Sequence, residues 1–295
     1  MPKVTVLVPT HDHCVTLKAS LGSALVQTMQ DLEILVVGDG APDETAAVIK
    51  RIGDRRIKYF PHAKGPRTGE IYRHALLTSE AQGEFVCYLS DDDLWLPNHL
   101  ETMCALLSQA DFAATMTVFV NLDFAPFVIP NYLQDSVNRE FILKISNRIA
   151  LTTAGHTLSF YKQLPYGWRT TPAGRWTDHY MWQQFLSLPE CRALSAPVVT
   201  SLKFPDPPRK QMSNNERLEE MEHWRKRIAE PDFDAIFAKE VLEGTIMHAA
   251  HNHSRAKLSE LELSEKVEEQ AAVIKMLEGQ LEQLRNLDLL SQGKS

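Results

Sequence analysis

Short apolar runs alternate with helix-like segments through the first hundred residues of this chain. This alternation is typical of βαβ units, in which helices connect the parallel strands of one sheet. We therefore predict an α/β fold with a mostly parallel sheet. The expected strands are residues 4–8, 32–37, 57–60 and 85–89, and the expected helices are residues 17–27, a segment that begins near residue 43, and residues 70–78.

The pattern becomes less regular after residue 93. Prolines are dense at residues 204–210, where they exclude regular structure and suggest a linker or a wrapping loop. We therefore expect a first domain over residues 1–205, followed by a Pro-rich linker and helical segment over residues 206–255. Between residues 93 and 204 the expected elements are a helix near residues 99–109, a strand over residues 115–122 and a helix over residues 180–186.

The last part of the chain carries a heptad pattern. Its apolar residues fall on alternating steps of four and three residues, with Gln270 as a polar exception. Such a pattern over about three heptads is near the minimum for a coiled coil. We expect a coiled-coil helix over residues 256–290 that joins copies of this chain, and the alternative is a long helix lying on the main domain. The apolar positions are Leu263, Val267, Ile274, Leu277, Leu281 and Leu284.

The composition indicates a globular protein and disfavours some kinds of partner. A chain of 295 residues with 44% hydrophobic residues can bury a sizeable core. Its net charge of −7 disfavours a nucleic-acid partner, which would require a basic face. The four cysteines have no paired short spacing, so we expect reduced thiols and a cytoplasmic protein. We expect no signal peptide before the strand at Val4, and any membrane association should be peripheral because no apolar run approaches ~18 residues.

Carboxylates follow three of the predicted strands. Asp12, Asp39 and the run 91–93 stand at strand ends, where ligands bind in an open α/β sheet. Three adjacent carboxylates repel one another, so a fold that aims them at one place requires a cation there. Oxygen ligands alone favour Mg²⁺ or Mn²⁺. The alternative is an acidic turn that caps the next helix, with Pro97 in the first helical turn.

Four stretches of the sequence carry a family resemblance: residues 6–12, residues 27–41, residues 83–97 and, less clearly, Thr177 with Asp178. Together they resemble family 2 of the glycosyltransferases over about residues 1–190. The resemblance implies the GT-A fold, a Rossmann-like fold of nucleotide-diphospho-sugar transferases. It also implies transfer of a sugar with inversion at the anomeric carbon.

The resemblance assigns the donor-binding positions near the first two strands. The family's first strand end lies near the nucleobase and corresponds to Pro9, Thr10 and Asp12 here. The second of two family aspartates, which recognises a uracil-type base, corresponds to Asp39, whereas Gly38 replaces the first. A carboxylate at Asp39 can accept from a base N–H. The alternative for Asp39 with the following glycine is a simple turn.

Further binding positions follow from the resemblance. Arg73 stands on the helix before the metal-binding strand, where a family cation reaches the nucleotide, and its alternative is a surface arginine. The acidic run corresponds to the family's Asp-X-Asp signature, so that Asp92 or Asp93 binds the ion and Asp91 lies near the ribose. The spacing does not decide which of them ligates. His156 occupies a place where relatives contact the acceptor or the diphosphate.

An inverting transfer requires a base that removes the proton of the acceptor hydroxyl on the side opposite the leaving diphosphate. Asp178 matches the position of that base in the family, and we prefer it to Asp206 or Asp135. The alternative role for Asp178 is an N-cap of the helix over residues 180–186. A metal ion at the acidic run stabilises the departing diphosphate. Three tryptophans could offer a face to a sugar ring but are more often core residues: Trp168, Trp176 and Trp182.

The resemblance also implies partners. The donor is a nucleotide-diphosphate sugar, with a UDP-sugar favoured, and the acceptor is a hydroxyl on a glycan, a lipid-linked intermediate or a protein. Cell-surface polysaccharide or glycan synthesis is the expected setting by analogy. His13, in the triplet 11–13, is not expected among metal ligands, because neighbouring side chains of an extended segment alternate sides and no third ligand cluster is near.

Two other functions compete with the transferase. A nucleotidyltransferase of related architecture should carry a glycine- and arginine-rich phosphate loop after the first strand, where this chain has residues 9–12 instead. A non-catalytic scaffold could keep the fold and recruit partners through the helical tail. Gly38 favours that scaffold, whereas the intact acidic run and Asp178 argue against it.

Overall fold

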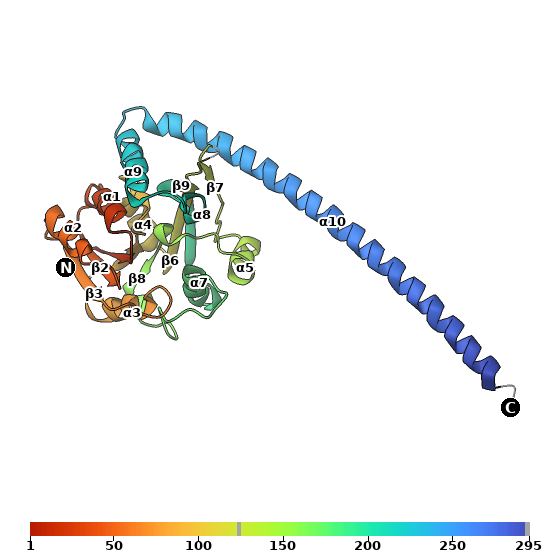
Figure 1. The fold of residues 1–295 in the computed structure, drawn as a ribbon. Coiled ribbons are helices and arrows are strands. Elements are labelled where there is room, and N and C mark those ends of the chain that lie inside the picture. Colours follow the sequence, from red (N-terminus) through yellow and green to blue (C-terminus); the bar gives the residue numbers. More distant parts are fainter. Residues whose placement is uncertain (123–124, 293–295) are drawn as a thin grey trace. The chain divides into compact units, whose positions relative to one another are not determined.

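The structure, a computed structural model, describes residues 1–122 and 125–292 (Figure 1). The chain forms two compact units, Met1–Thr245 and Ile246–Ser295. The boundary that we expected at residue 205 therefore falls inside the first unit.

The first unit is built on one sheet with the strand order β3-β2-β1-β4-β8-β6-β9-β5, in which β7 pairs with β6. The strands β1, β2, β3 and β4 are parallel, as predicted. Beyond them β8 runs antiparallel to both of its neighbours. The bounds are β1 Val4–Thr10, β2 Leu32–Asp39, β3 Ile57–His62, β4 Phe85–Tyr88, β5 Leu94–Trp95, β6 Phe112–Phe119, β7 Phe127–Val128, β8 Ala154–Thr157 and β9 Ala193–Lys203.

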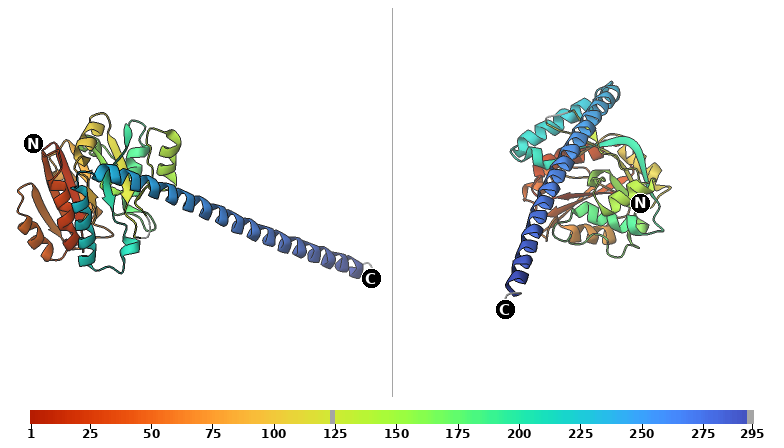
Figure 2. Two further views of the ribbon diagram at one scale, coloured as in Figure 1. Left: turned by 90° about the horizontal axis from the view of Figure 1, so that it is seen from above. Right: turned by 90° about the vertical axis from the view of Figure 1, so that its right-hand side faces the viewer.

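Helices cover both faces of this sheet (Figures 1 and 2). Because side chains alternate along a strand, Val6 and Val8 of β1 pack with α1 and α4, whereas Leu7 packs on the opposite face with α3 and α7. A strand buried on both faces is apolar throughout, which explains the continuous runs of the sequence. The bounds are α1 Cys14–Leu25, α2 Glu44–Ile52, α3 Glu70–Ser79, α4 His99–Leu107, α5 Ser136–Lys144, η1 Leu151–Thr153, α6 Leu158–Tyr161, α7 Thr177–Ser187, α8 Asp206–Arg209, α9 Asn214–Ile228 and α10 Phe233–Gln292.

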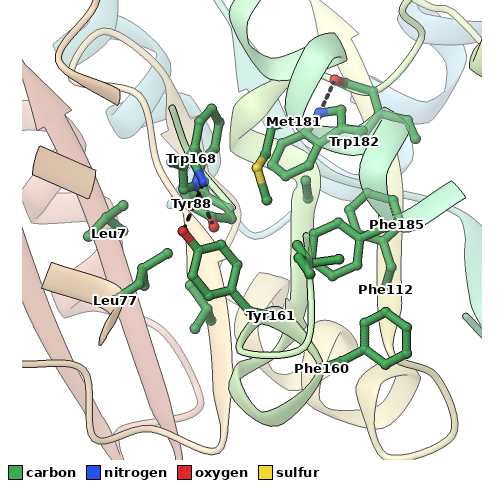
Figure 3. Packing of buried hydrophobic residues seen from close by; sticks show 14 of the residues in the cluster. Leu7, Leu77, Tyr88, Phe112, Phe160, Tyr161, Trp168, Met181, Trp182 and Phe185 are labelled. Carbon is green, nitrogen blue, oxygen red and sulfur yellow. Dashed lines mark hydrogen bonds between the residues drawn. The ribbon is translucent and has the colours of Figure 1, made fainter. Parts of the chain in front are cut away.

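The face that carries α7 holds an aromatic core (Figure 3). The Trp168 indole donates a hydrogen bond of 2.9 Å to the hydroxyl of Tyr88. Trp182 packs between Tyr88 and Phe112, at ring-centroid distances of 5.5 and 5.3 Å. This packing anchors α7 on the sheet and so fixes the position of residues at its N-terminus.

The proline-dense stretch is part of the first unit and not the linker that we expected. Pro207 and Pro208 stand in the first turn of the short helix α8, where a missing N–H costs nothing, and Pro205 is the N-cap residue. Buried Arg209 ties α8 to α9 through an ion pair of 2.5 Å with Glu220. A capping box of Ser213 and Glu216 starts α9, and its Met221 and Trp224 join the core.

The second unit is the continuation of helix α10. Its apolar residues Leu263, Val267 and Ile274 are exposed in the single chain. The side chains of Leu277, Leu281 and Leu284 lie outside the described residues. The coiled coil therefore stays a prediction. Within the described residues, no helix is both long and apolar enough to cross a membrane.

Candidate functional site

The carboxyl ends of β1 and β2 and the segment after β4 border a cavity of about 220 Å³, here called the donor cavity. They meet there because parallel strands end at one edge of a sheet. Six of the predicted binding residues stand in its wall: Pro9, Thr10, Asp12, Asp39, Arg73 and Asp91.

Asp39, at the end of β2, is held by the loop that follows β3. One carboxylate oxygen accepts from the Lys64 ammonium at 2.7 Å, and the other accepts from the Gly65 N–H at 2.6 Å. Gly69 has φ +71°, and a Cβ there would lie 2.7 Å from the Cβ of Asp39. A glycine is therefore required for this loop to fold over Asp39. Each carboxylate oxygen keeps a further lone pair for a ligand.

Gly38 stands where the resembling family has another aspartate, and Tyr59 explains the difference. A Cβ on Gly38 would lie 2.7 Å from the Tyr59 hydroxyl and 3.0 Å from its ring. The tyrosine of β3 thus occupies the place of an aspartate side chain.

Arg73 is buried at 6% exposure, so it is not the surface arginine of the alternative interpretation. It donates at 2.8 Å to the carbonyl of Thr68, and its guanidinium lies 4.9 Å from the ring centre of Trp168. Burial lowers the pKa of Arg73. Within the described residues, its Nε and the hydroxyl of Thr10 lack hydrogen-bond partners. Buried polar groups are normally paired, so these two fit a polar ligand in the donor cavity.

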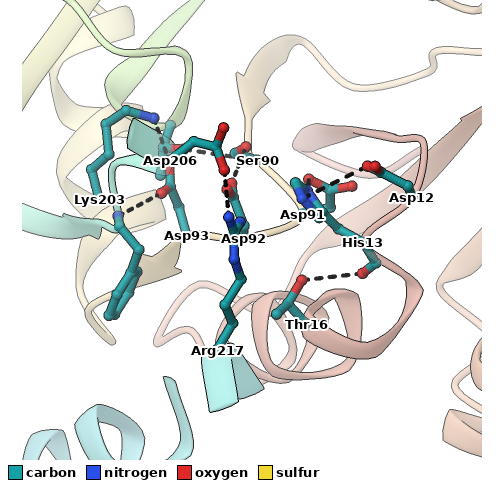
Figure 4. Close-up of polar contacts among 12 residues, drawn as sticks. Asp12, His13, Thr16, Ser90, Asp91, Asp92, Asp93, Lys203, Asp206 and Arg217 are labelled. Carbon is teal, nitrogen blue, oxygen red and sulfur yellow. Dashed lines mark hydrogen bonds and ion pairs between the residues drawn. The ribbon is translucent and has the colours of Figure 1, made fainter. Parts of the chain in front are cut away.

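A cluster that could hold a metal ion lies beside the donor cavity (Figure 4). His13, Asp91 and Asp92 each offer a ligand atom, and these atoms lie within 4.8 Å of one another. His13 Nδ1 is 3.2 Å from Asp91 Oδ1, and this hydrogen bond raises the pKa of His13 to about 9. The geometric reason for which we excluded His13 does not hold. The residue has φ −98° and ψ 35° at the start of α1, so the alternation of an extended segment does not apply to it.

Asp93 lies apart from that cluster and is fully buried. Its carboxylate accepts from the Thr152 hydroxyl at 2.5 Å and from the Phe204 N–H at 3.0 Å, and Lys203 Nζ lies 3.5 Å away. Burial raises the pKa of Asp93, and the charge of Lys203 opposes this rise. Both oxygens are thus engaged in the fold, and we remove Asp93 from the proposed metal ligands.

Asp178 is the second residue of α7, whose N-cap position is Trp176. The alternative role as the cap of this helix is therefore wrong, although Asp178 Oδ1 accepts from the His179 N–H at 2.9 Å. Asp178 lines a cavity of about 460 Å³, here called the second cavity. Burial raises the pKa of Asp178, and the charge of Lys203 opposes this rise.

Lys203, the last residue of β9, was not predicted from the sequence. It lines the second cavity beside Asp178. The charge of Asp93, followed by those of Asp92 and Asp178, raises the pKa of Lys203. The ammonium is therefore positive at neutral pH. The carboxylates that act on it are Asp92 of the metal cluster, the buried Asp93 and the candidate base Asp178.

His156 lies in the core and not at the site that we expected. It is fully buried in β8, where its Nε2 lies 2.6 Å from the Tyr88 hydroxyl and its Nδ1 lies 3.0 Å from the Thr157 carbonyl. Burial lowers the pKa of His156 to about 4, so the ring is neutral. Antiparallel pairing of β8 between β4 and β6 places it there.

The other candidates have structural roles. Asp135 accepts at 2.8 Å from the Asn138 N–H and caps α5. Asp206 forms an ion pair of 2.5 Å with Arg217. Trp168 and Trp182 are core residues, whereas Trp176 is 62% exposed at the second cavity. Of the three candidates for the base, Asp135 and Asp206 are engaged in the fold, whereas Asp178 lines the second cavity.

Sequence comparison identifies relatives. The model of Glycosyl transferase family 2 matches residues 5–163, more than half of the chain. A Campylobacter jejuni protein named GalNAc(5)-diNAcBac-PP-undecaprenol beta-1,3-glucosyltransferase is 38% identical over 35% of this chain and 34% of the relative. An Escherichia coli protein named UDP-Glc:alpha-D-GlcNAc-diphosphoundecaprenol beta-1,3-glucosyltransferase is 32% identical over 35% of this chain and 40% of the relative. The matches therefore span less than half of these relatives' length.

Structural comparison identifies the fold. TarS 1-349 from S. aureus, in complex with UDP-GlcNAc, has a TM-score of 0.55 at 17% identity, over 69% of this chain and 58% of that chain. This similarity confirms the predicted α/β architecture as the GT-A fold of glycosyltransferases. With that fold, and with a family model that matches more than half of its length, the chain belongs to Glycosyl transferase family 2.

Proposed function

We propose that this chain is a metal-dependent glycosyltransferase that moves a sugar from a UDP-sugar to an acceptor hydroxyl with inversion. One observation carries the proposal: a donor cavity with unpaired polar groups adjoins a cluster of side chains that could hold a metal ion. Lys203, whose pKa the charges of Asp93, Asp92 and Asp178 raise, lines a second cavity together with Asp178. The alternative of a non-catalytic scaffold would not require these groups to be kept together.

The donor cavity suits a nucleotide. Asp39 can accept from a base N–H, and Arg73 can donate from its unpaired Nε to a phosphate or ribose oxygen. Pro9, Thr10 and Asp12 form the wall along the end of β1. The names of TarS in complex with UDP-GlcNAc and of the Escherichia coli glucosyltransferase support a uridine nucleotide.

The metal cluster suits Mn²⁺ better than Mg²⁺. An imidazole nitrogen with two carboxylates is a mixed donor set, and Mg²⁺ prefers oxygen ligands alone. His13, Asp91 and Asp92 would hold the ion at the edge of the donor cavity. A bound ion supplies positive charge that stabilises the departing diphosphate.

Asp178 is the proposed base. Its position in the wall of the second cavity allows the carboxylate to accept the proton of an acceptor hydroxyl. The base must be ionised, and the charge of Lys203 favours that form against the effect of burial. The acceptor would enter from the side of the second cavity, while the donor occupies the first.

The relatives suggest the class of acceptor. Both named glucosyltransferases carry undecaprenol with a diphosphate in their names. We propose a lipid-linked glycan as the acceptor and bacterial polysaccharide synthesis as the setting. A protein acceptor is the alternative that an acceptor screen would reveal.

Thermal stability in the presence of nucleotides tests the donor class. A ligand that binds the native state raises the melting temperature. We expect UDP with Mn²⁺ to raise it more than GDP or CDP, and Asp92→Ala to lose the part that depends on Mn²⁺. Glu44→Gln, an exposed change in α2, should behave as wild type. Absence of a shift with every nucleotide would favour the scaffold.

A further inference from the structure

The second cavity is lined by an unusual set of cations. Three arginines, Arg67, Arg148 and Arg175, stand in its wall together with Lys203 and the candidate base Asp178. They come from three separate segments: the loop before α3, the segment after α5 and the turn before α7. Their convergence on one cavity is therefore a product of the fold.

The three guanidinium groups are not neutralised by carboxylates. Over residues 1–122 and 125–292, none of them forms an ion pair with an aspartate or glutamate. Arg67 donates at 3.1 Å to the carbonyl of Arg175, Arg148 donates at 3.3 Å to the amide oxygen of Asn138, and Arg175 donates at 3.3 Å to the amide oxygen of Gln183.

Each of these partners is neutral, and each guanidinium has five N–H donors. Arg148 is positioned by Phe141, whose ring centre lies 4.2 Å from its Cζ. Most of the donor capacity of the three side chains thus remains for a ligand. A guanidinium fork matches the oxygens of a phosphate in a bidentate manner.

Several other arginines of the same unit are paired with carboxylates. Arg56, Arg192, Arg209 and Arg217 form ion pairs of 2.5 to 3.0 Å with carboxylates. Carboxylates are abundant in a chain of net charge −7, yet three arginines that lack a carboxylate partner among the described residues meet at this one cavity. Arg67 also has φ +56°, a conformation that non-glycine residues rarely adopt.

We propose that the second cavity binds an acceptor whose reactive sugar is attached to a diphosphate, and that Arg148 and Arg175 hold that diphosphate. This inference rests on the proposed function, because it assigns the acceptor class of the same site. The exposed indole of Trp176 in the same wall offers an apolar face to the sugar ring. Asp178 then faces the hydroxyl of a sugar that the two arginines fix at its anionic end.

The arginines of the second cavity could also bind the diphosphate of the donor instead of that of the acceptor. Arg67 borders both cavities and can serve either ligand. Arg148 and Arg175 line the second cavity, and neither is among the described residues that line the donor cavity. These two residues therefore separate the acceptor from the donor in an experiment.

Binding of a matched pair of probes tests the proposal. The full chain, saturated with UDP and Mn²⁺, is titrated by calorimetry with decyl diphosphate-linked GlcNAc and with the uncharged decyl glycoside of GlcNAc. We expect the diphosphate probe to bind at least about tenfold more tightly, since charge-assisted hydrogen bonds contribute strongly. The preference should shrink at high salt.

Variants of Arg148 and Arg175 then test whether these residues cause the preference for the diphosphate probe. Arg175→Gln and Arg148→Gln should each weaken the diphosphate probe about tenfold and leave UDP affinity unchanged. Arg175→Lys should restore part of the loss. Arg51→Gln, an exposed change on α2, is the matched control. Melting temperatures check that Arg148→Gln, which loses its contact with Phe141, stays folded.

Two results would overturn the inference. Equal affinity for both probes would show that the cavity does not recognise the diphosphate. Equal loss of UDP and probe affinity in Arg175→Gln would assign the arginine to the donor instead. Failure of UDP to bind at all would instead contradict the proposed function, so the two failures are distinct.

Discussion

Lys203 Nζ lies 3.5 Å from Asp93 Oδ2, and the same ammonium stands with Asp178 in the wall of the second cavity. The ammonium of Lys203 thus forms an ion pair with the fully buried Asp93, and its charge also acts on the proposed base Asp178. The first pairing concerns stability, because a buried unpaired charge is costly. The second concerns catalysis, because a nearby positive charge favours the ionised base.

Removing Lys203 should affect stability and the pH profile separately. Lys203→Met leaves Asp93 without its counter-charge and should lower the free energy of unfolding by about 2–3 kcal/mol. It also raises the pKa of Asp178. Since the base acts when ionised, the acidic limb of kcat/KM against pH should move to higher pH. Urea unfolding and pH-dependent initial rates measure the two effects.

The double variant Lys203→Met with Asp93→Asn is the control. It removes both charges of the buried pair, so it should recover part of the lost stability. It should keep the shifted pH profile, because Asp178 still lacks the charge of Lys203. An unshifted profile in both variants would show that Lys203 acts on stability alone.

Asp178→Asn should abolish proton removal while keeping the donor site. The amide cannot act as a base, and loss of a general base typically costs about 10²–10⁴-fold in rate. We expect kcat to fall by such a factor, whereas the stabilisation by UDP and Mn²⁺ stays as in wild type. Glu44→Gln is the control for an exposed acidic position. Unchanged transfer to the true acceptor would rule out Asp178 as the base.

The raised pKa of His13 should make the free energy of unfolding depend on pH when divalent ions are removed. Its pKa is about 9 in the folded chain, against about 6.5 when unfolded. A raised pKa stabilises the fold fully below the unfolded value, and this stabilisation is lost as pH rises through about 9. We expect a loss of about 1–3 kcal/mol between pH 6 and pH 10, with partial exposure reducing the value.

Urea unfolding in EDTA at these two pH values measures the effect. His13→Gln removes the titrating group, so its stability should change less over the same range. Identical losses in wild type and His13→Gln would assign the dependence to other groups. Since a metal ligand must be deprotonated, the stabilisation by Mn²⁺ should grow over the same pH range in wild type.

The sequence predicted the parallel half of the sheet and the edge at which the site lies. Continuous apolar runs identify buried parallel strands, and carboxylates that follow such runs must meet at one edge. Asp39 and Asp91 were found in this way, whereas Arg73 was assigned from the family resemblance. Their neighbours Lys64 and Gly65 were missed, because nothing in a loop sequence shows that it folds back over a strand end.

Residues far apart along the chain account for the other differences. Lys203 reaches the site from β9, and its partner Asp93 could not be told from Asp92 by spacing because adjacent carboxylates look alike. His13 was excluded by a conformation that the chain does not adopt. His156 was placed near the site by family position alone, although its β-strand pairs inside the sheet and buries it.

The helical tail gives the last prediction. Leu263, Val267 and Ile274 expose apolar side chains along α10, and a solvent-exposed apolar repeat favours association with another helix. We expect the full chain to sediment as an oligomer and a chain ending at Lys257 to sediment as a monomer. Val267→Glu places a charge in the repeat and should weaken association. Glu265→Gln, at a neighbouring exposed position, is the matched control. If the chain ending at Lys257 sediments as the same species as the full chain, the coiled coil is wrong, and the first unit would then be responsible for any association.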